Sequence, residues 1–297
     1  MHKNRLIIIS LFLFLIFSCS NTQKIQTPLK NSKTAILFIS SNESEAKNWN
    51  PFFEKIKNNG QSLTSYFPCQ NCTFEEAKKE VTQVYHSINS STHAQNIIII
   101  GHGEGTLLAA ELSFSKFDDP SLKKIILLSV IAQNYKEIIH AQMTTQMARD
   151  LFSESDLNKD GKISQVELPE KLKNVAALNE NFTQGDLLRL LEKQYQGFLK
   201  LVEKNNEQSF ILGRPVLWFR ELFNSPSLIS KASSFTRPVT LIHTKFDNVA
   251  PFYANAFTFY NKLRSLKKET ELFTIKNDEK LYSNEEALAL IFKKMVL

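Results

Sequence analysis

Short runs of apolar residues alternate with amphipathic segments along most of the chain. Runs of this kind, without polar alternation, predict the strands of a parallel sheet that is covered on both faces. The segments between them have apolar residues at helical spacing and predict the covering helices. The expected strands are residues 34–40, 62–67, 97–100, 124–131, 238–243 and 271–275, and the expected helices are residues 49–58, 75–89, 106–114, 254–266 and 283–297.

Two details refine this pattern. Residues 41–47 are polar and are expected to form a loop, whereas Asn59-Gly60 is a typical helix end. Ser283 and Glu286 are expected to cap the last helix.

The alternation of strands and helices stops between residues 134 and 235. Apolar residues in this segment recur mostly at helical spacing, which predicts a helical insertion. The chain is therefore expected to consist of a core, residues 34–133 and 236–297, interrupted by an insertion at residues 134–235.

The first residues predict an export signal. Met1–Arg5 is short and basic, and Leu6–Phe17 is apolar apart from Ser10. This apolar run is too short to span a membrane and is typical of a signal peptide, here residues 1–18. The protein is therefore expected in the cell envelope.

Cys19 gives the signal a second interpretation. The segment Ile16–Ser20 resembles a bacterial lipobox. That resemblance implies a diacylglyceryl group on Cys19, which would anchor the mature chain to a bacterial membrane, in the periplasm or at the cell surface. The alternative is ordinary cleavage after Ser20, because Ser18 and Ser20 are both small. Residues 19–33 are polar and without periodicity, which predicts a flexible tether.

Composition describes a globular protein with a large core. Of the 297 residues, 42% are hydrophobic and 22% are charged. The net charge of +6 is modest, and no basic stripe interleaved with aromatic residues is present. Nucleic acid is therefore not an expected partner.

Cys69 and Cys72 form a Cys-x-x-Cys pair in a chain that is expected to be exported, where disulfides form readily. Because Thr73 follows the pair and opens a predicted helix, a local structural disulfide is expected. A thiol–disulfide redox centre is the alternative. Two cysteines without a further cysteine or histidine nearby are too few for a zinc site.

The stretch from Ile97 to Ala110 carries the strongest fold signal. A strand of isoleucines runs into a turn with Gly101 and Gly105 four positions apart, and then into a helix. Such a turn is too tight to admit a Cβ at either glycine. It resembles the Gly-x-Ser-x-Gly turn of the α/β-hydrolase family, in which the serine is the nucleophile. The central position here is Gly103, which has no hydroxyl, thiol or carboxylate.

This resemblance implies an α/β-hydrolase fold, a mostly parallel sheet with helices on both faces and a helical lid formed by the insertion. It also implies that the loop at Ser41 and Asn42 and the N–H group of Glu104 supply oxyanion-hole donors. Asp247, just after the strand 238–243, matches the acid of the catalytic triad.

The matching base is missing. It would be a histidine in the loop at residues 276–280, but none of the 6 histidines follows His243 in the sequence. His102 is expected to pack beside the turn, and His243 is expected to be a core histidine. Glu104 is one residue too late to replace the serine, because shifting the turn would place bulky His102 where a small residue is needed.

Residues 156–167 match the twelve-residue calcium loop of an EF-hand at each diagnostic position. Gly161 allows the sharp turn, and Ile163 is the apolar residue expected between ligands. The alternative is a polar loop with accidental carboxylates. No second loop is found, since Asn179–Gly185 lacks both the spacing and the acids. The expected Ca²⁺ ligands are Asp156, Asn158, Asp160, the Lys162 carbonyl, Ser164 and Glu167.

The sequence thus predicts an exported, membrane-anchored calcium-binding protein on an α/β-hydrolase fold that has lost its serine nucleophile and histidine base. Such a pseudoenzyme would bind an unidentified ligand or protein partner. The rival hypothesis is an active esterase-, lipase- or peptidase-like hydrolase with an atypical nucleophile, either Glu104 or a serine of the insertion.

Overall fold

The computed structural model describes residues 32–92, 94–164, 166–167, 181–204, 210–276 and 280–295. The expected signal peptide, Cys19 and most of the tether lie outside the described residues. In the described part of the chain, no helix is both long and apolar enough to cross a membrane.

A 6-stranded parallel sheet forms the centre of the fold, with the strand order β10-β9-β4-β3-β1-β2. Ile97 to Ile100 of β3 are fully buried, as the apolar run predicted for a strand covered on both faces. The strands are β1 (Thr34–Ile39), β2 (Ser62–Tyr66), β3 (Asn96–His102), β4 (Leu122–Leu128), β9 (Val239–Thr244) and β10 (Thr270–Ile275).

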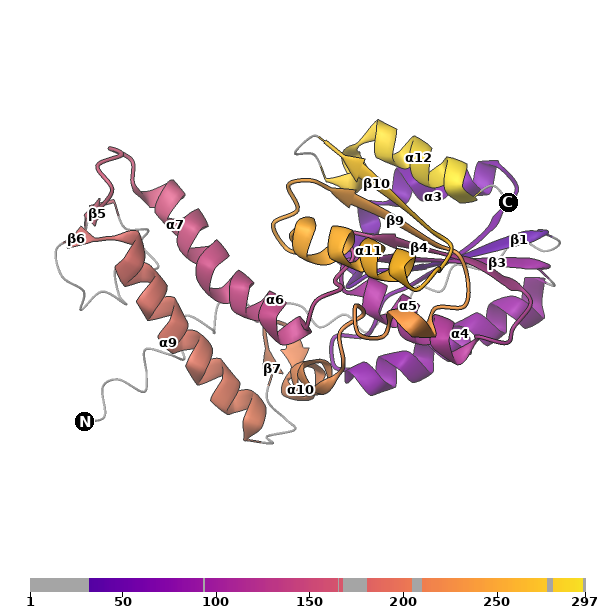
Figure 1. The fold of residues 1–297 in the computed structure, drawn as a ribbon, viewed down its shortest axis with the longest axis horizontal. Helices are drawn as coiled ribbons and strands as arrows, with labels where there is room; N and C mark the ends of the chain where they lie inside the picture. Colours follow the sequence, from indigo (N-terminus) through magenta and orange to yellow (C-terminus); the bar gives the residue numbers. More distant parts are fainter. Residues whose placement is uncertain are drawn as a thin grey trace. The chain divides into compact units, whose positions relative to one another are not determined.

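Helices cover both faces of this sheet (Figure 1). On one face, Phe52 and Phe53 of α3 and Ile291 of α12 join one apolar cluster with residues of β1, β3 and β9. The other face is covered by α4, α5 and α11. These helices are α3 (Asn50–Asn58), α4 (Phe74–Thr92), α5 (Gly105–Ser115), α11 (Thr258–Ser265) and α12 (Glu285–Met295).

Three local predictions were wrong. Residues 41–47 include a short helix, α2 (Glu43–Lys47), because the side chain of Asn42 caps it by accepting the N–H of Glu45 at 2.8 Å. The strand expected at 124–131 ends at Leu128, since Ser129 has a φ of 48° and turns the chain. The cap of α12 is Asn284, whose side-chain oxygen accepts the N–H of Ala287 at 2.8 Å.

Contacts divide the described residues into two compact units. The core unit contains the sheet and consists of the described residues of Ser20–Tyr135 and Glu221–Leu297. The helical unit is Lys136–Arg220. It contains α6 (Tyr135–Ala141), η2 (Gln142–Gln146), α7 (Met147–Ser155), β5 (Ile163–Ser164), β6 (Asn181–Phe182), α9 (Gln184–Glu203), β7 (Phe210–Ile211), β8 (Arg214–Pro215) and part of α10 (Val216–Asn224).

Within the helical unit, α7 and α9 pack through a small apolar cluster. Ala148 of α7 contacts Leu187 and Leu191 of α9, and all three are buried. Thr183 and Asp186 form a capping box at the start of α9, which satisfies the first N–H groups of that helix. Phe198 of α9 meets Phe219 edge to face at 5.3 Å between ring centroids.

Candidate functional site

A pocket of about 530 Å³ lies in the core unit, at the carboxyl ends of the central strands. Ligands of open parallel sheets bind at this edge, because the loops that follow the strands converge there. The pocket is lined by Ser41, Asn42, Ser44, Glu45, Asn48, His102, Gly103, Ser129, Thr244, Phe246, Asp247, Asn248, Val249, Lys280, Leu281 and Tyr282. The structure thus brings Gly103 and Asp247 together in one pocket.

The turn between β3 and α5 is as tight as its glycine spacing predicted. A Cβ on Gly105 would lie 2.2 Å from the carbonyl oxygen of Ile39, and one on Gly101 would lie 2.8 Å from the Cβ of Ala109. Neither distance is sterically possible without movement of the backbone or of α5. The two glycines therefore allow α5 to pack directly against the ends of β1 and β3.

Gly103, at the centre of the turn, has more free space around it than Gly101 and Gly105 have. It has a φ of +55°, and a Cβ there would have only the Glu45 Oε1 atom nearby, at 3.8 Å. A side chain at this position would point into open space in the pocket. Residue 103 itself therefore provides no side chain to the pocket.

Glu45, which the sequence analysis did not single out, lies beside Gly103. Its Oε1 is 3.1 Å from Nδ1 of His102, and its Oε2 accepts hydrogen bonds from the hydroxyls of Ser40 and Ser41. Burial alone would raise the pKa of Glu45, but His102 and the two serines outweigh it and hold the pKa below its ordinary value. The Glu45 carboxylate is therefore ionised at neutral pH.

His102 packs beside the turn, as expected, and lies edge-on to Trp49 at 5.1 Å between ring centroids. Its side chain is 9% exposed and forms part of the pocket wall. No described residue forms a hydrogen bond to its Nε2 atom, so that nitrogen remains available at the pocket.

Asp247 follows β9, where the resemblance placed the triad acid. Its Oδ1 accepts the N–H groups of Val249 and Ala250, both at 2.9 Å, which fixes the carboxylate in the loop. Its Oδ2 is 3.8 Å from Nε2 of His243, too far for a hydrogen bond. The side chain is 11% exposed and lines the pocket.

His243 is fully buried on β9. Its Nε2 donates its proton to the carbonyl oxygen of Ala250 at 2.7 Å, and its Nδ1 has no partner among the described residues. Burial lowers the pKa of His243 and outweighs the opposite effect of Asp247. His243 is therefore a buried core histidine, as the sequence predicted, and its Nε2 proton is held by a backbone carbonyl.

Glu104 does not line the pocket. Its carboxylate accepts a hydrogen bond from the hydroxyl of Tyr135, which directs it away from the position of a nucleophile. Ser129 does line the pocket and has an uncommon positive φ for a serine. No signal in the sequence marked Ser129, because it follows an apolar run that looked like a longer strand.

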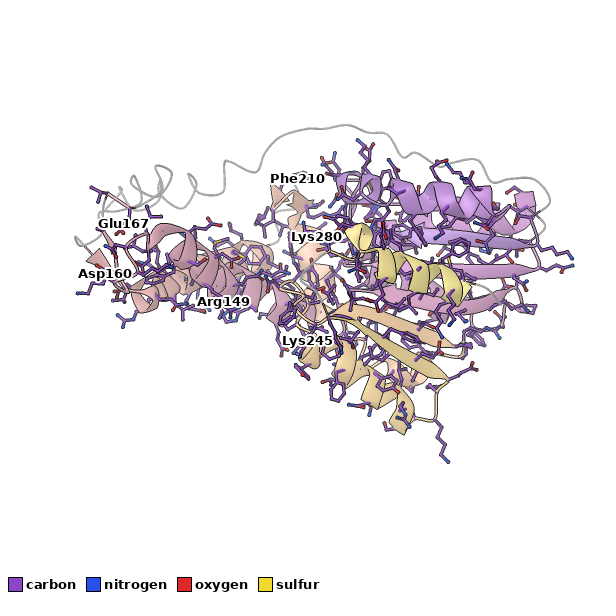
Figure 2. The ribbon with its side chains drawn as sticks, turned by 90° about the horizontal axis from the view of Figure 1, so that it is seen from above. Arg149, Asp160, Glu167, Phe210, Lys245 and Lys280 are labelled. Atoms are coloured by element: carbon purple, nitrogen blue, oxygen red, sulfur yellow. A yellow bond between two sulfur atoms is a disulfide. The ribbon has the colours of Figure 1, made fainter. Side chains whose placement is uncertain are left out.

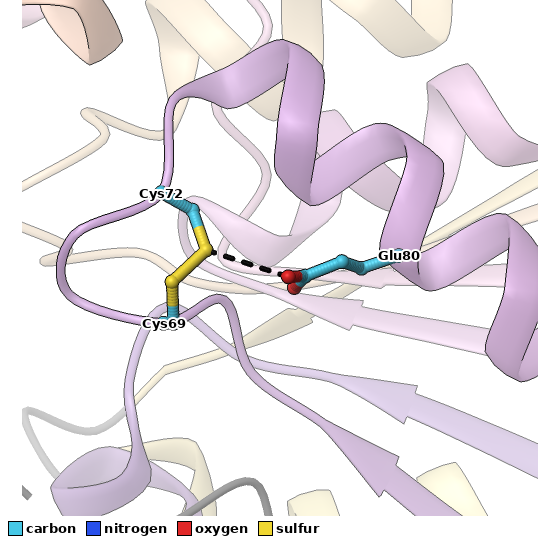
Figure 3. A group of neighbouring side chains, drawn as sticks. All are labelled: Cys69, Cys72 and Glu80. Carbon is cyan, nitrogen blue, oxygen red and sulfur yellow. Dashed lines mark hydrogen bonds between the residues drawn. A yellow bond between two sulfur atoms is a disulfide. The ribbon is translucent and has the colours of Figure 1, made fainter. Parts of the chain in front are cut away.

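Cys69 and Cys72 are joined by a disulfide at the start of α4 (Figure 3). Sγ of Cys72 lies 3.6 Å from Oε1 of Glu80, whose other oxygen accepts the hydroxyl of Tyr66 at 2.9 Å. In the described part of the chain, these two cysteines and Glu80 are the group whose potential metal-ligand atoms all lie within 4.8 Å of one another. The sulfur atoms are bonded to each other, so they are not thiolate ligands here.

In the loop that follows α7, side-chain oxygens accept hydrogen bonds from backbone N–H groups of the same loop. The two carboxylate oxygens of Asp156 accept the N–H groups of Asp160 and Gly161, each at 3.1 Å. Asn158 Oδ1 also accepts the Asp160 N–H, and Asp160 Oδ1 accepts the Lys162 N–H, both at 2.8 Å. Gly161 has a φ of +82°, which permits the reversal of the chain.

Glu167 closes this loop and lies at the same end of the helical unit as Asp160 (Figure 2). Its Oε2 accepts the N–H and the hydroxyl of Ser164 at 2.9 and 2.6 Å, and these bonds lower the pKa of Glu167. Ile163 is buried and pairs with Phe182 across β5 and β6. The carboxylate oxygens of Asp156, Asp160 and Glu167 do not all lie within 4.8 Å of one another.

Solved structures with a similar fold are α/β-hydrolases. A lipase-esterase related protein from Clostridium acetobutylicum is 15% identical over 91% of this chain and 98% of its own, with a TM-score of 0.53. A lipase in its open form has a TM-score of 0.56 at 10% identity, over 92% of this chain and 91% of its own. A monoacylglycerol lipase from Paleococcus ferrophilus has a TM-score of 0.52 at 14% identity, over 91% and 97%.

Neither the family models nor the curated proteins give a match to the sequence. The similarity of structure, together with the parallel sheet and its covering helices, confirms the fold class predicted from the sequence. The chain has an α/β-hydrolase fold.

Proposed function

We propose that this chain is an exported calcium-binding protein whose α/β-hydrolase fold retains a ligand pocket but performs no covalent catalysis. The observation that carries the proposal is Gly103, which occupies the centre of the tight turn, faces the pocket and has no attacking atom. A pocket of about 530 Å³ is large enough for a small organic ligand.

The surroundings of Asp247 support the same proposal. A triad acid acts by orienting a histidine, and the histidine nearest to Asp247 is buried His243, which donates its proton to a backbone carbonyl. The sequence contains no later histidine that could take the role of the base. The acid therefore remains without the group that it would orient.

Hydrolysis of nitrophenyl esters of short and medium chain length tests this proposal. We expect the wild type to show no turnover beyond that of the Asp247→Asn variant. Turnover in the wild type that disappears with Asp247→Asn would contradict it. The rival hypothesis of an atypical nucleophile predicts instead that Glu104→Gln abolishes turnover, or that a serine-directed phosphonate labels the helical unit.

Calcium binding is proposed at the loop 156–167. Backbone N–H groups already hold the side-chain oxygens of Asp156, Asn158 and Asp160 within the turn. Carboxylate, amide and carbonyl oxygens are the ligands that Ca²⁺ prefers. Glu167 would complete the site by exchanging its bonds to Ser164 for the cation.

Calorimetric titration with Ca²⁺ tests this site. We expect one binding event in the wild type and in Glu154→Gln, which removes an exposed carboxylate just outside the loop. Glu167→Gln should weaken binding at least tenfold, because it removes the charged bidentate ligand. Equal heats for the wild type and Glu167→Gln would exclude the site.

We also propose that a lipid on Cys19 anchors the mature chain to a bacterial membrane. The support is the lipobox-like segment Ile16–Ser20. Mass spectrometry of the mature protein should find Cys19 as its acylated first residue. An unmodified protein that begins at Asn21 would support ordinary cleavage after Ser20 instead.

A further inference from the structure

The pocket contains one carboxylate, that of Asp247, whose closest ion-pair contact with a described residue is as long as 3.8 Å. The Oδ1 atom of Asp247 is occupied by two backbone N–H groups, whereas its Oδ2 has no hydrogen-bond donor among the described residues. The nearest titratable nitrogen, on His243, is 3.8 Å away and its proton is used by Ala250. A carboxylate oxygen without a described hydrogen-bond donor therefore lines the pocket.

A second carboxylate, that of Glu45, also lines the pocket. Glu45 Oε1 is the atom nearest to the open space above Gly103, at 3.8 Å from the position of a Cβ there. It is held by His102 and by two serine hydroxyls, so its position is fixed. The pocket is thus lined by two carboxylates, of which Glu45 is paired with His102 and two serines, whereas Asp247 keeps one oxygen without a described donor.

The two lysines near the pocket are not paired with either carboxylate. Lys280 lines the pocket but is exposed, and its Nζ lies over the ring of Tyr282 at 5.7 Å from the centroid. Lys245 is also exposed and its Nζ lies over Phe246. Figure 2 shows both lysines at the edge of the core unit where the strands end. Neither lysine forms an ion pair with a described residue.

Apolar side chains flank Asp247 in the same loop. Phe246 and Val249 line the pocket and are 56% and 50% exposed, although both are large hydrophobic residues. Tyr282 adds an aromatic ring on another loop. A ligand with a cationic head and an apolar body would match this arrangement, since aromatic faces also attract cations.

We propose that the pocket binds organic amines, with the protonated amine donating to Asp247 Oδ2 near Glu45 and the apolar part of the ligand resting on Phe246 and Val249. The ammonium would occupy the place of the imidazolium that forms during catalysis in a serine hydrolase. This inference rests on the proposed function, because it requires a pocket without the catalytic base.

Calorimetry with four small aromatic compounds tests the charge preference. We expect benzylamine to bind at least tenfold more tightly than benzyl alcohol, since a charged hydrogen bond is lost. Benzoate should not bind measurably. Benzyltrimethylammonium, which has the charge but no N–H donor, should bind more weakly than benzylamine.

Three variants test which side chains are responsible for benzylamine binding. Asp247→Asn retains the acceptor for the two backbone N–H groups, so it should fold normally and weaken benzylamine binding at least tenfold. Asp118→Asn changes an exposed carboxylate away from the pocket and should leave binding unchanged. Lys280→Met should strengthen binding, because it removes a positive charge at the rim.

The proposal is overturned if benzoate binds best, if Lys280→Met abolishes binding, or if Asp247→Asn binds benzylamine as well as the wild type does. The ester assay separates this outcome from failure of the proposed function. A chain that neither hydrolyses esters nor binds benzylamine contradicts the amine proposal alone, whereas ester turnover that depends on Asp247 contradicts the proposed function.

Discussion

The carboxylate of Glu45 lies 3.1 Å from Nδ1 of His102, and this contact joins the helix after β1 to the turn after β3. Glu45 also receives the hydroxyls of Ser40 and Ser41, so one acidic side chain holds both segments at the pocket. Trp49 packs against the other side of the imidazole. The wall of the pocket therefore depends on a residue that has no part in a conventional triad.

Replacing Glu45 by Gln should destabilise the protein at neutral pH by about 1–2 kcal/mol, because hydrogen bonds to a charged group are lost. The pKa of Glu45 is lowered in the folded state from its ordinary value of 4.5. Its contribution is therefore present above that value and disappears as the pH falls through the folded pKa. Urea denaturation from pH 7 to pH 3 should show the two proteins converging at low pH. A difference that is independent of pH would contradict the assignment.

The two glycines of the turn should respond differently to alanine. Gly105→Ala places a Cβ 2.2 Å from the Ile39 carbonyl oxygen and should cost about 3 kcal/mol or more. Gly103→Ala meets no atom closer than 3.8 Å and should cost only about 1–2 kcal/mol, from the left-handed backbone. Thermal denaturation measures both. Equal losses would show that the turn is not as tight on its Ile39 side as the structure indicates.

His243 should make the protein sensitive to acid. Burial lowers the pKa of His243 in the folded state, whereas the unfolded chain protonates it near its ordinary value of 6.5. Stability is therefore lost as the pH falls below that value, by at most about 1.4 kcal/mol per pH unit for one proton. In His243→Gln the amide can still donate to Ala250, and the stability should change less between pH 7 and pH 5. An unchanged slope would contradict the prediction.

Removing the disulfide should lower the free energy of unfolding only modestly. Cys69 and Cys72 are separated by 3 positions, and closing so short a loop stabilises a protein by about 2 kcal/mol in the chain-entropy model. The Cys69→Ser/Cys72→Ser variant should lose about that amount in urea denaturation. It should bind benzylamine normally. Reduction of insulin by the wild type, absent in the double variant, would favour a redox role instead.

The centre of the sheet could be predicted from the sequence because β1 and β3 are almost continuous apolar runs, which are typical of a sheet covered on both faces. The turn after β3 was equally clear, since only glycine tolerates the contacts found at Gly101 and Gly105. Predictions failed where a single polar side chain decides the outcome. Asn42 starts a helix in a segment that looked like a loop, and Asn284 replaces Ser283 as the cap of α12.

The pocket was only partly predictable. Gly103 and Asp247 could be placed because each occupies a fixed position in a familiar order of strands. Glu45 could not, because its role depends on the rotation of α2 and on a contact with a residue far away in the sequence. The positive φ of Ser129 also has no sequence signature, since Leu128 and Val130 on either side are apolar.

The central sheet is continuous across the insertion, because two of its neighbouring strands come from the chain before and after the helical unit. β4 and β9 pair directly, with Leu128 beside Ile242, although the helical unit separates them in the sequence. The rings of Tyr135 and Phe223, which flank that unit, are 6.2 Å apart between centroids. A short glycine-serine linker in place of residues 136–220 should therefore give a minimal hydrolase-like domain, on which ligand recognition could be studied without the loop 156–167.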